Sequence, residues 1–442
     1  MIKRFFGLRF AGGVIIVAAI IIAVSLGASR RSAAVPNDTY ESLRGFADVL
    51  SMVQDNYAEP VEAKVLIDNA IKGMVKGLDP HSSFMTPQEY AEMQVDTKGV
   101  FGGIGIEIGV KEGILTVIAP IDDTPASKAG LLAGDKIVKI NDKITREMTI
   151  TEAVTQMRGV KGTQVTIHIM RDTFEEPKPF TLTRDIIKVK SVKFKTLEDG
   201  FGYVKISQFQ ENTTVDLDKA LAELTPKEGQ LKGLVLDLRN NPGGLLQEAV
   251  SVSNFFIDKG LIVSTKGRVD GQDMTFNADG VKRQPDYPII VLVNGGSASA
   301  SEIVAGALQD HKRAAILGTT TFGKGSVQTI MPLPDGGALR LTTSKYYTPS
   351  GRSIQAKGIE PDIVVGDEGK AHMKERDLER HLAAEDGSDK VDNGVKKADK
   401  PVKEAVVGKS DKAAKDEDVQ LKRALEYLKS WYIFQAVSKK AA

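Results

Sequence analysis

The chain has 442 residues, of which 41% are apolar and 26% charged, so it can bury a sizeable core and is expected to hold two or three domains. Its formal net charge of +1 provides no electrostatic surface for nucleic acid, and no nucleic-acid partner is expected. Cysteine is absent and the five histidines show no zinc-ligand spacing, so we expect no disulfide, no metal and no other cofactor.

Residues 1–31 have the pattern of a membrane anchor or signal segment. Lys3, Arg4 and Arg9 precede an uncharged run from 10 to 27, which as a helix would span about 27 Å, close to the hydrocarbon thickness of a bilayer. The end of this run lacks the small residue that a cleavage site carries three positions before the cut, which favours an uncleaved anchor over a removed signal peptide. We therefore expect an exported protein that is anchored in the inner membrane or periplasmic.

A helical region is predicted over residues 38–95. Its apolar residues recur at intervals of three and four, which is typical of helix faces that pack on a core or on a second subunit. We therefore expect a homo-oligomer, most simply a dimer. Within this region the Asp-Pro and Ser content of 78–85 indicates a loop. His81 in that loop is not assigned a catalytic role, because nothing nearby in sequence completes a site.

A separate module is predicted over residues 96–190. Strands are expected at 106–108, 114–118, 134–141 and 163–170, and helices at 125–130 and 151–158. This order resembles a PDZ domain. The resemblance implies a carboxylate-binding loop formed by Gly102, Gly103, Ile104 and Gly105. Successive N–H groups of such a loop can hold a chain-terminal carboxylate while the peptide adds to the sheet as a strand. The alternative for these glycines is a plain hairpin turn.

Arg158 ends the second predicted helix of this module. We hypothesise that it contacts the following domain and couples peptide binding to a site there, since a charged residue at a domain-facing helix end can form a switch. The alternative is a solvated arginine that interacts with the C-terminal end of its own helix.

An α/β core is predicted after this module. The run Gly233–Arg239 reads as a strand that is buried on both faces, and it leads into a turn that contains Gly243 and Gly244. A second buried strand, Ile289–Val293, ends in a similar turn at Ser299. Helix N-termini expose unpaired N–H groups with a partial positive charge. Two such strand-to-helix turns, set side by side, would form an oxyanion hole.

Ser299 and Lys324 make a serine hydrolase with a lysine base the leading interpretation. Ser299 lies among small residues that allow a sharp turn, and Lys324 lies between two glycines that let a substrate approach. To act as a base, Lys324 must be neutral near working pH, so its pKa must fall from about 10.4 toward 7 or 8. Burial supplies such a shift when no carboxylate lies close, and the run 319–330 contains no acidic residue.

Other polar residues nearby offer alternatives. Ser297 and Ser301 are rival nucleophiles. His311, next to Asp310, could serve a Ser/His mechanism, but Asp310 lies about 16 Å along the helix axis from Ser299. Asp310 is therefore assigned either a structural role or a role in supporting the catalytic residues without touching the substrate.

Together the motifs over about residues 40–365 resemble the carboxyl-terminal processing, or tail-specific, proteases. The resemblance implies Ser299 as nucleophile, Lys324 as general base and Gln328 as the residue that orients the lysine. It also implies oxyanion donors from the backbone of Ala300 and of either Gly243 or Gly244.

The same resemblance implies polypeptide substrates with apolar C-termini, and an adaptor or regulatory protein as a possible further partner. It also demands a bend in the chain. On a straight strand Lys324 and Gln328 would lie about 13 Å apart, so their contact cannot form without one.

The composition changes abruptly beyond Val365. Lys, Asp and Glu crowd residues 366–417, which predicts a flexible linker with solvated charges. An apolar stripe from Leu421 to Tyr432 predicts a C-terminal helix over 418–442. That helix could dock on the core or on a second subunit, and the sequence does not choose between them.

The expected fold class is α/β, or more fully α+β multidomain. In chain order it comprises an N-terminal membrane anchor, a helical arm, an inserted PDZ domain, an α/β serine protease core over 191–365, a charged linker and a terminal helix. The expected function is an exported serine endopeptidase that recognises apolar C-terminal tails. The alternative is a membrane-anchored PDZ scaffold with an inactive hydrolase core, which labelling of Ser299 by a serine-reactive probe would distinguish.

Overall fold

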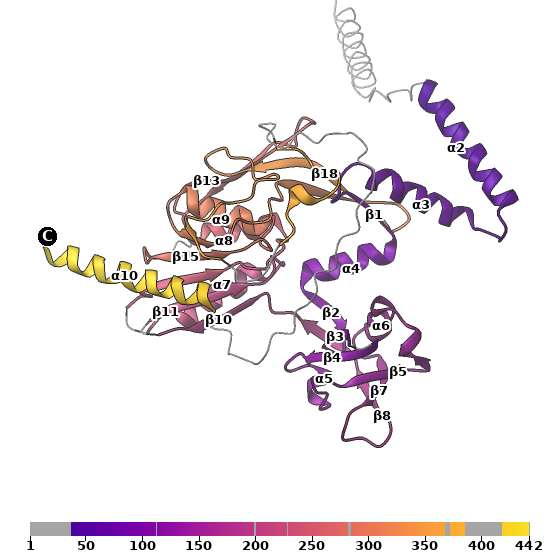
Figure 1. Cartoon of the computed structure of the whole chain (residues 1–442), viewed down its shortest axis with the longest axis horizontal. Coiled ribbons are helices and arrows are strands. Elements are labelled where there is room, and N and C mark those ends of the chain that lie inside the picture. Colours follow the sequence, from indigo (N-terminus) through magenta and orange to yellow (C-terminus); the bar gives the residue numbers. More distant parts are fainter. Residues whose placement is uncertain are drawn as a thin grey trace, which may run out of the picture. The chain divides into compact units, whose positions relative to one another are not determined.

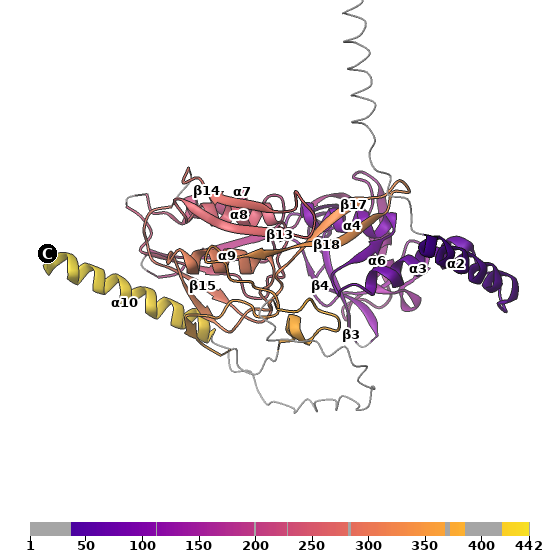
Figure 2. The same cartoon turned by 90° about the horizontal axis from the view of Figure 1, so that it is seen from above.

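The computed structural model describes residues 37–111, 113–198, 200–227, 229–281, 284–366, 372–384 and 418–441 (Figures 1 and 2). The chain divides into two compact units, Met1–Gly73 and Met74–Ala442. The predicted membrane segment, 10–27, lies outside the described residues. Within the described residues no helix is long and apolar enough to cross a membrane.

The first unit contains α2 (Asn37–Asn56) and most of α3 (Ala63–Lys76), so this part of the region is helical as predicted. The apolar residues of α2 are exposed in the single chain: Phe46 is 45% and Val49 is 58% exposed. An amphipathic helix with an uncovered apolar face is typical of an interaction surface. The homodimer stays a prediction.

Residues 78–85 are not entirely the predicted loop. Ser83–Met85 form β1, which pairs antiparallel with β18 (Ala338–Tyr347). Turn-forming residues precede this short strand and indicate a loop. The composition of 78–85 gives no sign of the strand, because its pairing partner lies far along the chain. α4 (Pro87–Lys98) follows and begins with a capping box, in which Thr86 and Glu89 each accept from the other's backbone N–H.

The module predicted around 96–190 has its own sheet and its own core. The main sheet has the order β3-β4-β5-β7-β8, β6 adds to β5, and β2 pairs separately with β9. The elements are β2 (Val100–Gly103), β3 (Ile106–Lys111), β4 (Ile114–Pro120), α5 (Pro125–Lys128), β5 (Lys136–Ile140), β6 (Lys143–Ile144), η1 (Thr145–Glu147), α6 (Ile150–Met157), β7 (Gln164–Met170), β8 (Lys178–Thr183) and β9 (Asp185–Lys188). Alternate residues of β7, Val165, Ile167 and Ile169, are buried in this core, as the period of a strand requires.

The α/β core is built on a six-stranded sheet with the order β10-β11-β12-β15-β16-β19, in which every pair except β10–β11 is parallel. Its elements are β10 (Val192–Thr196), β11 (Phe201–Ile206), α7 (Thr213–Leu224), β12 (Gly233–Asp237), α8 (Leu246–Asn254), β15 (Ile289–Val293), α9 (Ala300–Asp310), β16 (Ala315–Gly318) and β19 (Ile363–Val364). Every residue of β12 and β15 is buried, as predicted. Because these strands are parallel neighbours, the turns that follow them meet at one edge of the sheet.

A second, antiparallel sheet combines β1 and β18 with β13 (Gly260–Gly267), β14 (Met274–Ala278) and β17 (Ser326–Pro332). Figure 1 shows α8 and α9 between the two sheets, and α9 contacts β13 on one side and β16 on the other. The β17–β18 hairpin begins two residues after Lys324, so the lysine lies at the start of this hairpin.

The C-terminal helix α10 (Val419–Ala441) packs on the six-stranded sheet and contacts β12, β15 and β16. Ala424 and Leu428 are buried there, in one cluster with Val235 and Leu292. Of the two alternatives that the sequence left open, the first part of this helix therefore docks on the core. Farther along, Trp431 is 56% exposed.

Part of the predicted linker is packed against the core. Residues 372–384 are described and contain η2 (Glu375–Asp377), in which Glu375 is fully buried. The expectation of solvated charges is wrong for this residue, because His81 and Gln355 supply polar partners. Residues 385–417 lie outside the described part of the chain.

Candidate active site

Ser299 occupies the sharp turn between β15 and α9. Its φ of 57° and ψ of −114° are unfavourable for a non-glycine residue, which is the strained geometry of a nucleophile elbow. The turn is held by its surroundings, since the N–H of Ala298 donates to the Asn241 carbonyl at 3.0 Å. This geometry exposes the Ser299 side chain to a cavity.

The two rival serines anchor the same turn. Ser297 Oγ donates to the Leu238 carbonyl at 2.8 Å, and Ser301 Oγ donates to the Asn241 carbonyl at 2.9 Å. Both residues are fully buried. Among the three serines Ser299 alone lines the cavity, so the geometry favours Ser299 as the reactive hydroxyl.

The turn after β12 lies against Ser299. Gly243 has a φ of 105°, and a Cβ at this position would lie 2.7 Å from the Ser299 Cβ, so a side chain does not fit. The Gly243 N–H donates to Asn241 Oδ1 at 2.9 Å, whereas Gly244 lines the cavity with Ser299 and Ala300. Ala300 is the first residue of α9, where N–H groups have no acceptor within the helix. The geometry favours Gly244 over Gly243 as the donor that would act with Ala300.

Glu302 joins the serine turn to the lysine loop. Its Oε2 accepts from the N–H of Ser299 at 2.8 Å and from the N–H of Lys324 at 2.9 Å. Its Oε1 accepts from Thr321 Oγ1 at 2.5 Å and from the Gly323 N–H at 2.7 Å. Burial raises the pKa of Glu302 to about 7, although all four donors favour its charged form. One carboxylate oxygen thus fixes the backbones of both candidate catalytic residues.

The Lys324 amine lies where its positive charge is disfavoured. Burial lowers the pKa of Lys324 below its ordinary value, and the positive charge of Arg340 on β18 lowers it further. The carboxylates of Glu375, Glu302 and Asp79 act in the opposite direction. The expectation that no carboxylate lies near the lysine is therefore wrong, because all three lie outside the run 319–330 and reach the lysine through the fold. The net shift is still downward, as a general base requires.

Tyr346 on β18 also contacts both residues. Its hydroxyl donates to the Lys324 carbonyl, and its N–H donates to the Gly325 carbonyl at 3.0 Å. Burial raises the pKa of the phenol well above its ordinary value, so it stays neutral, and the Ser299 side chain hydrogen-bonds to it. The phenol is thus a further neutral group at the serine hydroxyl.

Gln328 lies on β17 and lines the same cavity. Its Nε2 donates to Ser326 Oγ at 2.9 Å and to Thr342 Oγ1 at 3.3 Å. The register of the strand shifts between Val327 and Gln328, which supplies an irregularity close to the required bend. Direct orientation of Lys324 by Gln328 stays a prediction.

Asp310 and His311 lie at the end of α9 that is remote from Ser299. Asp310 pairs with Arg352, with 2.5 Å between Oδ1 and Nη2. The Nε2 of His311 lies 2.7 Å from the carbonyl oxygen of Leu261. These contacts hold neighbouring segments, and the geometry does not support a Ser/His mechanism.

The predicted carboxylate-binding loop is partly a strand. Gly102 and Gly103 belong to β2 and pair with β9, so this half of the run is a paired strand. A Cβ at Gly102 would lie 2.1 Å from the Gly159 carbonyl oxygen, and this close backbone approach explains the glycine. Ile104 is buried in the module's core, and Gly105, with a φ of 80°, leads into β3. Carboxylate binding by this run stays a prediction.

Arg158 follows the last residue of α6. Its guanidinium carbon lies 4.7 Å from the centroid of the Phe101 ring, which is a cation–π contact within the module. This contact is neither of the two roles that the sequence offered for Arg158. Coupling of Arg158 to the core stays a prediction.

The cavity beside Ser299 has a volume of about 540 Å³. Its wall is largely apolar and includes Phe209, Leu246, Phe276, Ile303 and Val327. An apolar cavity with a few convergent polar groups is the usual form of a substrate site. This one suits an apolar side chain of a substrate bound at Ser299.

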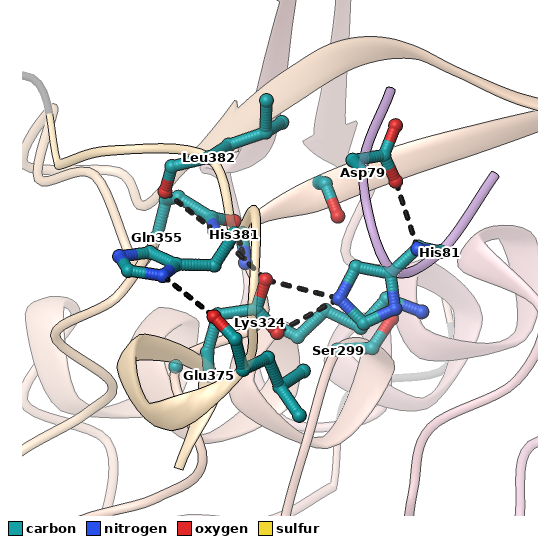
Figure 3. A network of polar contacts seen from close by, with 12 residues as sticks. Asp79, His81, Ser299, Lys324, Gln355, Glu375, His381 and Leu382 are labelled. Atoms are coloured by element: carbon teal, nitrogen blue, oxygen red, sulfur yellow. Dashed lines mark hydrogen bonds and ion pairs between the residues drawn. The ribbon is translucent and has the colours of Figure 1, made fainter. Parts of the chain in front are cut away.

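His81 and Glu375 are neighbours of the site that were not predicted from the sequence. His81 Nε2 lies 2.8 Å from Glu375 Oε2, and Figure 3 shows this pair in one cluster with Lys324 and Ser299. The two residues are 294 positions apart, so no local pattern joins them. The role of Glu302, three residues after Ser299, also went unnoticed, although the third helical position commonly returns a carboxylate to the helix start.

Comparisons with known proteins agree with this architecture. The family model of peptidase family S41 matches residues 200–365, and that of the PDZ domain matches residues 102–177. The family model of the activating protease CtpB N-terminal domain matches residues 22–89. A carboxy-terminal-processing protease of Bartonella bacilliformis is 49% identical over 385 residues, covering 85% of this chain and 88% of that protein. A probable CtpA-like serine protease of Staphylococcus haemolyticus is 38% identical over 362 residues, covering 81% of this chain and 72% of that protein.

Among solved structures, the photosystem II D1 C-terminal processing protease is 33% identical with a TM-score of 0.44, and the match covers 71% of this chain and 85% of that one. The fold and the relatives define a serine-type peptidase that carries a PDZ domain. The chain belongs to the carboxy-terminal-processing proteases of peptidase family S41, and the predicted resemblance is confirmed.

Proposed function

We propose that this protein is an exported endopeptidase in which Ser299 and Lys324 form a catalytic dyad that cuts polypeptides with apolar C-termini. The observation that carries the proposal is the single oxygen of Glu302 that accepts from the N–H groups of both residues beside an apolar cavity. The lowered pKa of Lys324 supports its role as the base.

Attack on the peptide begins with the neutral amine of Lys324. It takes the proton of Ser299 Oγ as that oxygen bonds to the carbonyl carbon of the scissile peptide. The electron pair of the C=O bond moves onto its oxygen, and the N–H groups of Ala300 and Gly244 stabilise the oxyanion. The C–N bond then breaks as the pair returns, and the Lys324 ammonium gives its proton to the leaving amine. The product at this stage is an ester on Ser299.

Water resolves this acyl-enzyme by the same route. Lys324 takes a proton from water as the water oxygen attacks the ester carbonyl, and it returns the proton to Ser299 Oγ as the ester bond breaks. Each proton is thus taken and returned by one amine. The scheme uses no metal and no redox cofactor.

A serine-reactive fluorophosphonate is expected to label the wild-type protein at Ser299, with peptide mapping to identify the modified residue. The reason is that the elbow presents this hydroxyl to the cavity next to a base. Ser299→Ala should not be labelled. Labelling at Ser297 or Ser301 would identify that residue as the nucleophile in place of Ser299. A folded wild-type protein without any label would indicate the inactive scaffold.

Capture of the substrate's C-terminus by Gly102–Gly105 is tested with peptides that differ only in their last three residues and in a free or amidated end. Amidation is expected to lower kcat/KM by about tenfold or more, because hydrogen bonds to a charged group contribute about 1.5–3 kcal/mol. The loss should fall mainly on KM. Ser299→Ala controls for background cleavage, and equal turnover of free and amidated peptides would exclude tail capture.

Location and partners belong to the same proposal. The uncharged run 10–27 supports an exported protein that is anchored in the inner membrane or periplasmic. The exposed apolar face of α2 supports a homodimer. We further propose that an adaptor or regulatory protein delivers the substrate. Arg158 is proposed to couple peptide binding in the PDZ domain to the active site.

A further inference from the structure

Two titratable side chains from opposite ends of the protease meet beside the lysine loop. The Nε2 of His81 lies 2.8 Å from Oε2 and 3.0 Å from Oε1 of Glu375 (Figure 3). Glu375 is fully buried, and the His81 side chain is 14% exposed. A buried carboxylate without polar partners is strongly unfavourable, and His81 supplies one of the partners that keep Glu375 in place.

Glu375 is also connected to the chain on both sides of Lys324. Its N–H donates to the Phe322 carbonyl at 3.1 Å. Its Oε1 accepts from Gln355 Nε2 at 3.0 Å, and Gln355 Oε1 in turn accepts from the Gly325 N–H at 3.0 Å. The loop that carries Lys324 is therefore held at 322 and at 325 by one network. Figure 3 shows Gln355, Glu375 and His81 in that network, with Lys324 beside them.

We propose that Glu375 and His81 are positioning residues of the protease, forming a buried pair that holds the Lys324 loop and sets the charge that faces its amine. The segment 372–384 is then a working part of the active site and not only the beginning of a linker. This inference rests on the proposed role of Lys324 as the base.

The charges around the amine predict opposite effects for the two partners. Lys324 is faced by Arg340 from β18, Glu302 from α9, Asp79 from the loop after α3, and Glu375 from η2. The Glu375 carboxylate raises the pKa of Lys324, so its removal should lower that pKa further. The Nε2 of His81 is placed to donate to the same carboxylate, so removal of the imidazole should leave that negative charge less balanced and raise the pKa of Lys324.

Arg340 belongs to the same arrangement, because its Nε donates to the His81 carbonyl at 3.1 Å. The cation that disfavours a charged Lys324 is thus attached to the segment that carries His81. His81→Ala keeps this backbone contact and removes only the imidazole. Its effect therefore reports on the pair with Glu375.

The test is the pH dependence of kcat/KM for a peptide substrate, measured on full-length Glu375→Gln and His81→Ala. The acid limb reports the base of the free enzyme. We expect Glu375→Gln to move this limb by about one unit to lower pH and His81→Ala to move it to higher pH. Glu379→Gln, the same chemical change at an exposed position of the same segment, should leave the limb in place.

The inference stands only if the two limbs move in opposite directions. Limbs that coincide with the wild type, or that move together, would overturn it. Loss of activity without a shifted limb would indicate a purely structural role. If Glu375→Gln does not fold, as judged by thermal unfolding, an unmoved limb in His81→Ala still overturns the inference. An active Lys324→Ala variant would instead refute the proposed function, so the two failures are distinguishable.

Discussion

Lys324→Ala is expected to lower kcat/KM by about a thousandfold or more, with most of the loss in kcat. The variant removes the only group in the proposed scheme that takes the Ser299 proton. It leaves the apolar cavity and the turns at Ala300 and Gly244 in place, so KM should change little. Steady-state kinetics with a peptide substrate measure both kcat and KM. Lys259→Ala, an exposed lysine of the core, is the matched control.

The wild-type pH profile sharpens this expectation. A lysine acts as base only when neutral, and burial lowers the pKa of Lys324, with Arg340 adding to the shift. Activity should therefore rise with pH along an acid limb that lies below the ordinary lysine range, and fluorophosphonate labelling should follow the same curve. If His311→Ala abolished hydrolysis while Lys324→Ala spared it, the lysine mechanism would be refuted.

Much of the core could be predicted because its signals are local. The apolar runs of β12 and β15, the small residues around Ser299 and the glycines at 243 and 244 all act within a few positions, and the structure places their turns together. The same is true of the alternating strands of the PDZ module. The fold could therefore be predicted from short-range sequence patterns and from backbone geometry.

The electrostatics of the site could not be predicted in this way. The neighbours of Lys324 in sequence include no carboxylate, whereas Glu302, Glu375 and Asp79 reach it through tertiary contacts. The charged composition around 375 also gave no sign of a buried residue, because a single carboxylate–imidazole contact in a hydrophilic segment has no compositional signature. Which glycine faces the cavity likewise depends on a single hydrogen bond, from Gly243 to Asn241.

Glu302→Gln is expected to lower kcat by about a hundredfold, although Glu302 is not predicted to touch the substrate. An amide has one acceptor oxygen where the carboxylate has two, so two of the four donors lose their acceptor and face an NH₂ group. The turn at Ser299 and the loop at Lys324 then lose their common support. A displacement of about 1 Å between reacting groups costs about a hundredfold in rate.

Stability gives an independent readout of the same variant. Burial raises the pKa of Glu302 from 4.5 to about 7, so its protonated form favours folding. This contribution is complete below about pH 4.5 and is lost as the pH rises through about 7, and it amounts to about 3 kcal/mol. The wild type should therefore lose stability relative to Glu302→Gln over that interval, as measured by chemical unfolding at several pH values.

The exposed Glu223→Gln on α7 is the matched control and should follow the wild type in both measurements. A Glu302→Gln variant that is labelled at Ser299 and turns over peptide at the wild-type rate would show that the turn and the loop hold their positions without the carboxylate. The alignment of Ser299 with Lys324 would then have to come from Tyr346, whose hydroxyl meets both residues from the opposite sheet.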